Sequence, residues 1–364
     1  MYIHLPFCRK KCFYCAFVAV IGQMSQAGRY VDCLGAEARA FAGRRIKTVF
    51  WGGGTPSLLP EPQLQRLMAI INRAFDTAGL IETSMEANPE DITPAKAVFL
   101  KKLGITRVSL GIQTFHDRHL KSLGRCHDRH QAYQAFENLR AAGFDNLNVD
   151  MMFALPGQTE DDVRADIKNL KAMNPDHVSY YALNIEKPSR FCVQGPRLPD
   201  ESEQVRTYTA IIEALRASSL EQYEISNFAR PGKRCRHNEN YWRGGDYIGL
   251  GVGAHSHLDG RRSWNVGRLK EYVGRIECQQ DPREGEEMLS PAQRLRETLT
   301  FGLRMNEGVE LKSIESDHQC AVDAGTLEKI ETFIQAGFLV PEGHRIKATD
   351  KGRLVLDEIA SYLI

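Results

Sequence analysis

The sequence has no long hydrophobic run and no excess of charge of either sign. None of its apolar stretches approaches the roughly 18 residues that a membrane-spanning helix needs. Its 47 Lys and Arg residues nearly balance its 46 Asp and Glu residues, which gives a formal net charge of +1. A balanced charge provides no general attraction for nucleic acid or for an anionic membrane. We therefore expect a cytoplasmic protein that binds no nucleic acid, with peripheral membrane contact left open.

The sequence also lacks a secretion signal, a low-complexity segment and a coiled-coil heptad pattern. We therefore expect its 9 cysteines to stay in a reducing compartment, where a disulfide framework does not form. The 364 residues exceed one ordinary domain and suit a large domain with a smaller appendage.

Three cysteines near the N-terminus are the most informative residues of the chain. Cys8, Cys12 and Cys15 have the spacing C-x3-C-x2-C. An iron–sulfur cluster of the four-iron type usually takes four cysteines, so three of them leave one iron free for a substrate or cofactor. Zinc is the main alternative, but the nearest histidine, His4, lies on an expected strand and not in the cysteine loop. The spacing favours an iron–sulfur cluster with an open position.

Short apolar segments with β-forming residues alternate with helical patterns through the first half of the chain. The expected strands are Tyr2–Leu5, Thr48–Trp51, Glu82–Glu86, Arg107–Gly111, Leu147–Phe153 and His177–Leu183. The helical patterns between them include Gln63–Phe75, Pro94–Leu103, His130–Ala142 and Asp161–Met173. Such alternation is typical of βαβ units on a parallel sheet. We predict an α/β fold in which residues 1–190 form an incomplete (β/α)6 barrel, in preference to a doubly wound sheet.

The preference for a barrel comes from the residues at the C-terminal ends of these strands, where functional groups of such barrels gather. They are the cysteine loop, the run GGGTP at 52–56, Glu86, Gln113, Asp150, Ala182 and Asn184. Consecutive glycines suit the close approach of a ligand to the main chain, although a tight turn explains them equally well. A single carboxylate at such a place is often a helix cap or an ion-pair partner, so the prediction rests on the joint pattern.

The end of the chain, residues 289–364, has the pattern of a separate winged-helix-like domain. Its expected elements are helices over Ser290–Leu303, Leu311–Ser316 and Thr326–Ala336, a hairpin over Phe338–Lys347 and a last helix over Thr349–Leu363. The third helix carries Glu328 and Glu331, whereas a helix that reads DNA should be basic. We expect a structural or docking role for this domain, and we assign residues 191–288 to an extension of the barrel.

The motifs along the chain resemble those of the radical S-adenosylmethionine (SAM) superfamily. More narrowly, they resemble the oxygen-independent coproporphyrinogen III oxidase-like family and its heme chaperone branch, HemW. The matching segments are YIHLPFC, FWGGGTPS, SMEANPE, SLGIQTF, NVDMMFALPGQT and IGLGVGAHS. The resemblance implies a [4Fe–4S] cluster on Cys8, Cys12 and Cys15. It also implies a SAM site formed by Tyr2, Tyr14, Gly53, Gly54, Thr55, Glu86, Gln113, Arg125, Asp150 and Ala182.

Three features separate the two branches of this family. The oxidases carry a further cysteine two residues after the third, where this chain has Phe17. They also carry a long segment ahead of the cluster, whereas seven residues precede Cys8 here. The third feature, HNENYW at 237–242, matches the HNxxYW motif of the chaperone branch, which implies heme binding by His237, Asn238, Tyr241 and Trp242. Cys235 is an alternative heme ligand.

The resemblance therefore implies a heme chaperone that binds a [4Fe–4S] cluster, SAM and heme and delivers heme to respiratory acceptor proteins. The alternative is a radical SAM enzyme that oxidatively decarboxylates coproporphyrinogen III. A cluster-based transcriptional sensor that uses the winged helix is a third and weaker hypothesis. The sequence leaves open whether SAM is cleaved and whether the chain forms a homodimer.

Overall fold

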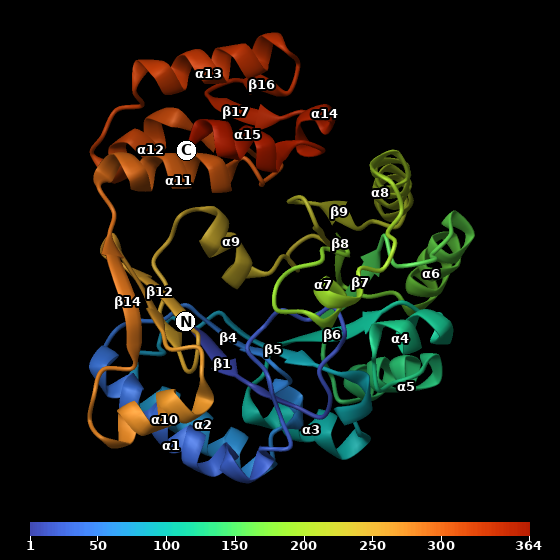
Figure 1. Cartoon of the computed structure of the whole chain (residues 1–364), viewed down its shortest axis with the longest axis vertical. Helices are drawn as coiled ribbons and strands as arrows, with labels where there is room; N and C mark the ends of the chain where they lie inside the picture. Colours follow the sequence, from blue (N-terminus) through green and yellow to red (C-terminus); the bar gives the residue numbers. More distant parts are fainter.

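The computed structural model describes residues 1–364 and is organised around one curved sheet of nine strands (Figure 1). The strand order is β11-β1-β4-β5-β6-β7-β8-β10-β9, and every pairing from β11 to β8 is parallel. The bounds are β1 Tyr2–Leu5, β4 Thr48–Gly53, β5 Glu82–Ala87, β6 Arg107–Gln113, β7 Leu147–Phe153, β8 His177–Ala182, β9 Glu221–Gln222, β10 Asn227–Ala229 and β11 Gly249–Leu250. The short strands β2 (Phe7–Cys8) and β3 (Val20–Ile21) pair separately in the cysteine loop.

Helices cover the convex face of this sheet, as the alternating pattern predicts. They are α1 (Ala27–Ala38), α2 (Glu61–Ala74), α3 (Pro94–Leu103), α4 (Asp117–Leu123), α5 (Arg129–Ala141) and α6 (Glu160–Met173), with α8 (Glu201–Arg216) near the antiparallel edge. The six predicted strands and the four predicted helices are present, with ends shifted by at most two residues. The two-residue strand β11 was not predicted, because a strand of this length leaves no periodic signal.

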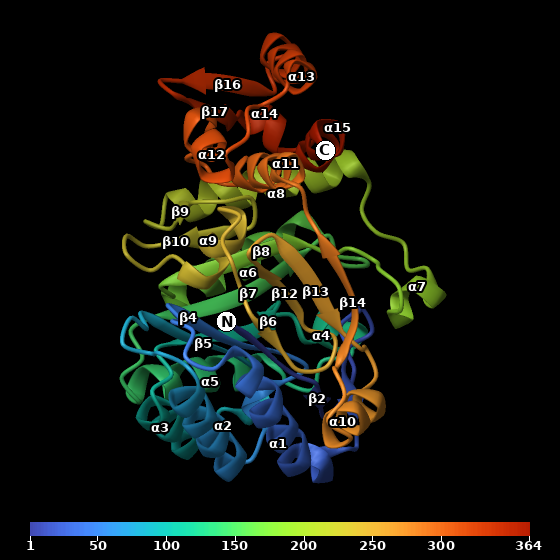
Figure 2. The same cartoon turned by 90° about the vertical axis from the view of Figure 1, so that its left-hand side faces the viewer.

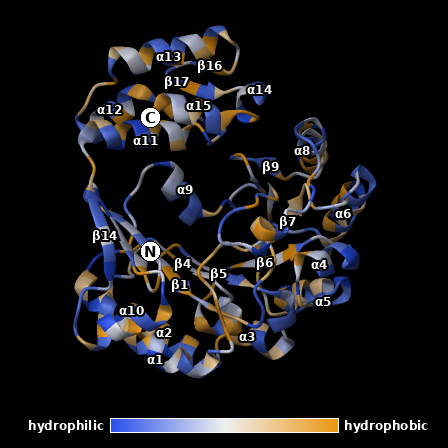
Figure 3. Ribbon diagram, viewed as in Figure 1, coloured by the Kyte–Doolittle hydropathy of each residue, from blue (hydrophilic) through white to orange (hydrophobic).

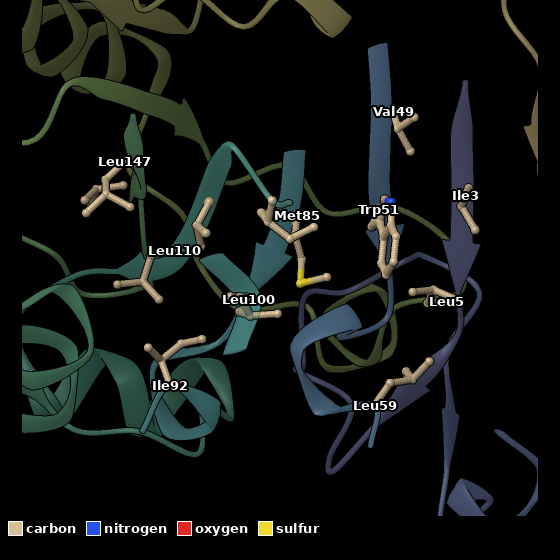
Figure 4. Packing of buried hydrophobic residues seen from close by; sticks show 14 of the residues in the cluster. Ile3, Leu5, Val49, Trp51, Leu59, Met85, Ile92, Leu100, Leu110 and Leu147 are labelled. Atoms are coloured by element: carbon tan, nitrogen blue, oxygen red, sulfur yellow. The ribbon is translucent and has the colours of Figure 1, made fainter. Parts of the chain in front are cut away.

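Alternation along the strands gives the sheet an apolar convex face and a polar concave face. Ile3, Leu5, Val49, Trp51 and Met85 point to the helices and belong to the main hydrophobic core (Figure 4). Figure 3 shows the same contrast, because hydrophobic residues follow the strands while the inner helix α9 is hydrophilic. The neighbouring positions on the concave side carry polar side chains such as Glu82, Arg107, Asn148 and His177, all buried. The barrel interior is therefore held together by hydrogen bonds.

Residues after β8 close the open side of the barrel. A second sheet orders β12 (His255–Leu258), β13 (Arg261–Asn265) and β14 (Arg283–Met288), and α10 (Leu269–Glu277) lies between β13 and β14 in the chain. Figure 2 shows β14 running from the α10 end of the molecule toward the C-terminal domain. The short helix α7 (Arg190–Gln194) lies near the cysteine loop, and α9 (Arg236–Trp242) lies between the main sheet and the C-terminal domain (Figure 1).

The C-terminal residues have a hydrophobic core of their own, whose buried members lie between Leu295 and Leu363. The elements are α11 (Pro291–Gly302), α12 (Leu311–His318), α13 (Ala324–Gln335), α14 (Asp350–Arg353) and α15 (Leu356–Leu363), with a sheet ordered β15 (Val309–Glu310), β17 (Arg345–Ala348) and β16 (Leu339–Glu342). The predicted hairpin is present, but the predicted last helix is divided into α14 and α15. The chain bends at Val355, so that Leu356 and Ile359 can reach this core. None of the helices combines the length and the apolar composition needed to cross a bilayer.

Candidate functional site

A pocket of about 140 Å³ at the C-terminal edge of the strands contains the three cysteines of the N-terminal motif. Predicted residues that line it are Cys8, Cys12, Tyr14, Cys15, Gly53, Gly54, Thr55, Glu86, Gln113, Arg125 and Asp150. Tyr2 and Ala182 do not line this pocket. The Tyr2 ring lies beside Phe50, and the neighbour of Ala182, Tyr181, reaches the pocket and donates to Gln113 Oε1 at 3.2 Å.

Two of the three sulfur atoms of the cysteine loop face polar side chains from other parts of the barrel. The Cys15 amide donates to the Cys12 carbonyl at 3.2 Å, which forms a turn between these two cysteines. Thr55 Oγ1 donates to Cys8 Sγ at 3.3 Å, and Arg125 Nη1 lies 3.5 Å from Cys12 Sγ. Burial raises the pKa of the Cys8 thiol to about 11, against the opposing effect of Thr55. Metal binding displaces thiol protons, so three thiols that line one pocket, two of them beside hydrogen-bond donors, suit the ligands of an iron–sulfur cluster.

The glycine run packs tightly against the first strand and the cysteine loop. Gly53 has a φ of 118°, and a Cβ atom at this position would lie 2.8 Å from the His4 ring. A Cβ atom at Gly54 would lie 2.6 Å from the Pro6 carbonyl oxygen. The packing of the chain thus requires both glycines, whether or not a ligand is bound. The Gly53 amide also donates to Glu86 Oε2 at 3.1 Å, which ties the turn to the third barrel strand.

Two carboxylates, Glu86 and Asp150, line the pocket together with the basic side chains of Lys10, Lys11 and Arg125. Burial, and then the nearby Asp150, raises the pKa of Glu86 to about 8. Burial also raises the pKa of Asp150, although Ser109 Oγ and Asn148 Nδ2 donate to this carboxylate at 3.0 and 2.7 Å. Buried acids with raised pKa values gain from a cationic ligand. The ammonium and sulfonium groups of SAM meet this requirement.

Arg125 supplies the positive side of the pocket and is held in place by neutral acceptors. Its Nη2 donates to the Gly111 carbonyl at 2.6 Å and to Asn88 Oδ1 at 2.8 Å. Asn88, Ser109 and Tyr181 line the pocket but were not among the predicted residues. Asn88 follows β5 directly, so the rule that functional groups gather at strand ends could have identified it. Phe17 also lines the pocket, and it is 69 % exposed.

The segment HNENYW forms α9 on the concave side of the barrel, and its histidine is locked in place. His237 is only 2 % exposed. Its Nδ1 lies 2.9 Å from Thr48 Oγ1, and its Nε2 lies 2.9 Å from the Tyr241 hydroxyl. The ring stacks on Phe50 with centroids 5.1 Å apart. Both ring nitrogens of His237 are therefore occupied in this arrangement.

The start of α9 is anchored by a carboxylate from the barrel. Glu82 accepts from the backbone amides of Arg236 and His237 at 2.9 and 3.2 Å, which places a negative charge at the positive end of the helix. The Cys235 thiol lies 3.6 Å from Glu82 Oε1 and is fully buried, and burial raises its pKa to about 12. Cys235 thus lies inside the protein as a neutral thiol.

The end of α9 meets the C-terminal domain. The Arg304 guanidinium lies 4.8 Å from the Trp242 ring centroid, and Arg243 Nη2 lies 2.6 Å from Glu307 Oε1. Tyr241 lines a cavity of about 40 Å³ and Trp242 a neighbouring cavity of about 220 Å³. Asn238 is half-buried on the same helix. Two predicted heme residues, Tyr241 and Trp242, thus lie at the boundary between the barrel and the C-terminal domain.

Comparisons with known proteins cover nearly the whole chain. The model of the radical SAM superfamily matches residues 2–170, and the model of the HemN C-terminal domain matches residues 289–355. The heme chaperone HemW of Lactococcus lactis is 35 % identical over 355 residues, which cover 96 % of this chain and 93 % of that protein. The heme chaperone HemW of Bacillus subtilis is 34 % identical over 367 residues, which cover 98 % and 97 %.

A solved structure has the same arrangement of both domains. The coproporphyrinogen III oxidase HemN of Escherichia coli, described as a radical SAM enzyme, superposes with a TM-score of 0.87 at 26 % identity. The match covers 100 % of this chain and 89 % of that one. This likeness supports the fold that the sequence predicts, a radical SAM barrel followed by a C-terminal helical domain.

Proposed function

This chain belongs to the radical SAM superfamily and, among its HemN-like members, to the HemW family, and on that premise we propose that it is a heme chaperone. It would hold heme as cargo and deliver it to heme-accepting respiratory proteins. The relatives named heme chaperones match it over more than nine-tenths of its length. The sequence similarity therefore covers both the barrel and the C-terminal domain.

Membership of the superfamily implies a [4Fe–4S] cluster and SAM as cofactors. We propose Cys8, Cys12 and Cys15 as the cluster ligands, since these thiols share one pocket with hydrogen-bond donors to two of the sulfurs. When bound, the cluster and SAM supply radical chemistry. Within the pocket, Glu86 and Asp150 would bind the cationic groups of SAM. Arg125 would order the cysteine loop and hold the carboxylate end of SAM.

The position of α9 is the observation that carries the heme proposal. HNENYW is not a surface loop, because Thr48, Phe50 and Glu82 hold its first half against the barrel. Its second half presents Tyr241 and Trp242 to cavities beside the C-terminal domain. We propose that this half forms one wall of the heme site and that His237 anchors it. Asn238 would lie on α9 between the anchoring His237 and the two aromatic residues of this wall.

The alternative function is oxygen-independent decarboxylation of coproporphyrinogen III. The likeness to the E. coli oxidase and the proposed SAM pocket favour it. Against it, Phe17 occupies the position at which the oxidases carry a further cysteine, beside the proposed cluster. The greater identity to the HemW relatives also favours the chaperone.

Heme transfer tests the proposal directly. We would reconstitute the cluster anaerobically in the full chain, titrate it with hemin, and record the Soret band. The loaded protein would then be mixed with an apo-cytochrome, and we expect the cytochrome spectrum to appear. In parallel, coproporphyrinogen III, SAM and a reductant would be supplied. Failure to bind hemin, together with decarboxylation of coproporphyrinogen III, would overturn the chaperone proposal in favour of the alternative.

A matched pair of variants would link the result to α9. Tyr241→Ala removes an aromatic ring from the motif, and Tyr362→Ala removes one from an exposed position on α15. We expect hemin affinity to fall in the first variant and to be unchanged in the second. Equal hemin affinity in the two variants would show that the Tyr241 ring of the motif does not contribute to heme binding.

A further inference from the structure

We propose that a cavity between α1, α10 and the β12–β13–β14 sheet binds a heteroaromatic ring that carries a phosphate group, as in a nucleotide. The cavity has a volume of about 560 Å³, and small-molecule pockets commonly have about 300–1,000 Å³. Figures 1 and 2 show α1 and α10 side by side at the end of the molecule opposite the C-terminal domain. The cavity shares no lining residue with the cysteine pocket, so this site is separate from the proposed SAM site.

The walls of this cavity are fixed by contacts between distant segments. Glu37 on α1 accepts from the Tyr272 hydroxyl of α10 and from Asn265 Nδ2 of β13, both at 2.6 Å. Both oxygens of this carboxylate are thereby hydrogen-bonded. Arg29 of α1 also forms an ion pair with Glu277 of α10. The three walls are therefore held together, and a ligand requires no movement of the C-terminal domain.

The cavity has a buried polar floor and an exposed rim. On the floor, Asn265 is 5 % exposed and uses Nδ2 for Glu37 and for the Gly251 carbonyl, which leaves Oδ1 free. Ser263, two residues earlier on the same face of β13, and Gln280 on the rim form no side-chain hydrogen bond within the chain. Amide and hydroxyl groups of this kind bind the polar edge of a nucleobase or a flavin ring.

Apolar side chains from three elements line the same cavity. Phe41 follows α1, Leu258 lies on β12 and Ile276 lies on α10, and each of them is half-buried. Contact with aliphatic and aromatic side chains removes the faces of a flat ring from water. Apolar walls with a few free polar groups are typical of a small-molecule site.

The charges around the cavity leave one cation without a partner. Arg283 pairs with Asp281 and Glu286, and Arg261 pairs with the same Glu286. Arg39, an exposed residue directly after α1, also lines the cavity, and its guanidinium forms no ion pair or hydrogen bond within the chain. A guanidinium binds phosphate oxygens through paired hydrogen bonds. Arg39 therefore gives the site its preference for a phosphate group.

Two nucleotides titrated into the reconstituted full chain test the proposal. Adenosine monophosphate would be followed by calorimetry and flavin mononucleotide by the quenching of its fluorescence, with adenosine and riboflavin as the matching compounds without phosphate. We expect at least one nucleotide to bind, and its matching compound to bind at least about tenfold more weakly. Excess SAM should not displace the nucleotide, because SAM has a separate pocket. Binding of neither nucleotide, or full displacement by SAM, would overturn the proposal.

Two variants assign the binding to this cavity. Arg39→Gln removes the free cation and Ser263→Trp fills the space above the floor, so each should lower nucleotide affinity about tenfold or more. Arg39→Gln should leave the affinity for the compound without phosphate unchanged. Arg73→Gln, at an exposed arginine of α2, is the matched control and should bind as the wild type does. Wild-type affinity in either folded variant would contradict the proposal, and if circular dichroism shows Ser263→Trp to be misfolded, Arg39→Gln decides.

Discussion

Thr48 Oγ1 lies 2.9 Å from His237 Nδ1, across 189 residues of sequence. This contact joins the second barrel strand to the HNENYW helix α9. Together with the Tyr241 hydroxyl on the other nitrogen, it fixes the imidazole inside the protein. His237 thus acts here as an anchor of α9, and the segment it anchors carries the aromatic residues at the domain boundary.

Loss of this anchor should cost stability. In Thr48→Val, the buried Nδ1 of His237 loses its partner, so we expect the free energy of unfolding to fall by about 1–3 kcal/mol. Urea titration followed by circular dichroism measures the difference. Thr209→Val on the exposed surface of α8 serves as the control and should change stability little. Equal stability of the two variants would show that the contact contributes nothing.

The cluster should depend on each cysteine of the motif. Cys12→Ser should abolish it, because two thiolates cannot hold a four-iron cluster in place. Iron and acid-labile sulfide per chain after anaerobic reconstitution give the measurement. Cys192→Ser, at an exposed thiol of α7, should keep the full content. Hemin binding should survive in Cys12→Ser, since Tyr241 and Trp242 of the proposed heme wall lie outside the cysteine pocket.

Asp150→Asn should weaken SAM binding. The substitution removes a carboxylate proposed to bind the cationic groups of SAM, and charge-assisted hydrogen bonds contribute about 1.5–3 kcal/mol, which is roughly tenfold to 100-fold in affinity. Equilibrium dialysis of labelled SAM against the reconstituted protein would measure the loss. Asp145→Asn, at an exposed carboxylate paired with Lys233, changes the net charge equally. A similar loss in Asp145→Asn would indicate a general charge effect.

A buried acid behind β11 should make stability depend on pH. Glu37 accepts from Tyr272 and Asn265 side chains and from the Gly251 amide at 2.6, 2.6 and 2.8 Å, yet burial raises its pKa from 4.5 to about 7. Between these values the folded protein keeps a proton that the unfolded chain has released. The free energy of unfolding should therefore fall by about 3 kcal/mol as the pH rises from 4.5 to 7.

Glu37→Gln should remove this contribution and flatten the pH profile of stability in that window. Urea titrations at several pH values would measure it. Glu213→Gln, at an exposed position on α8, should keep the wild-type slope. If the free energy of unfolding of Glu37→Gln changed with pH as steeply as that of the wild type, the pH dependence would come from other titratable groups.

The sequence could predict the barrel strands and most of the cysteine pocket, because both depend on local signals. The alternation of strands and helices gives the fold class, and the strand-end rule gathers Glu86, Gln113 and Asp150 into one pocket. Motif resemblance supplied Tyr14 and Arg125, which lie far from any strand end in sequence. Tyr2 came from the same resemblance, whereas Ala182 was also named by the strand-end rule, and both lie outside the pocket lining.

Other features could not be predicted because they depend on contacts between distant segments. The locking of His237 needs Thr48, and the cap of α9 needs Glu82. The β12–β13–β14 sheet pairs short polar strands whose alternation is weak.

The barrel and the C-terminal domain have separate hydrophobic cores, and the contacts between them combine a small apolar cluster of Tyr223, Ala229, Met305 and Trp242 with charged pairs such as Arg243 with Glu307 and Arg262 with Glu297. Mobile ions screen the charged pairs, while they affect the apolar packing far less. Added salt should therefore weaken the charged part of this contact and leave the apolar cluster in place.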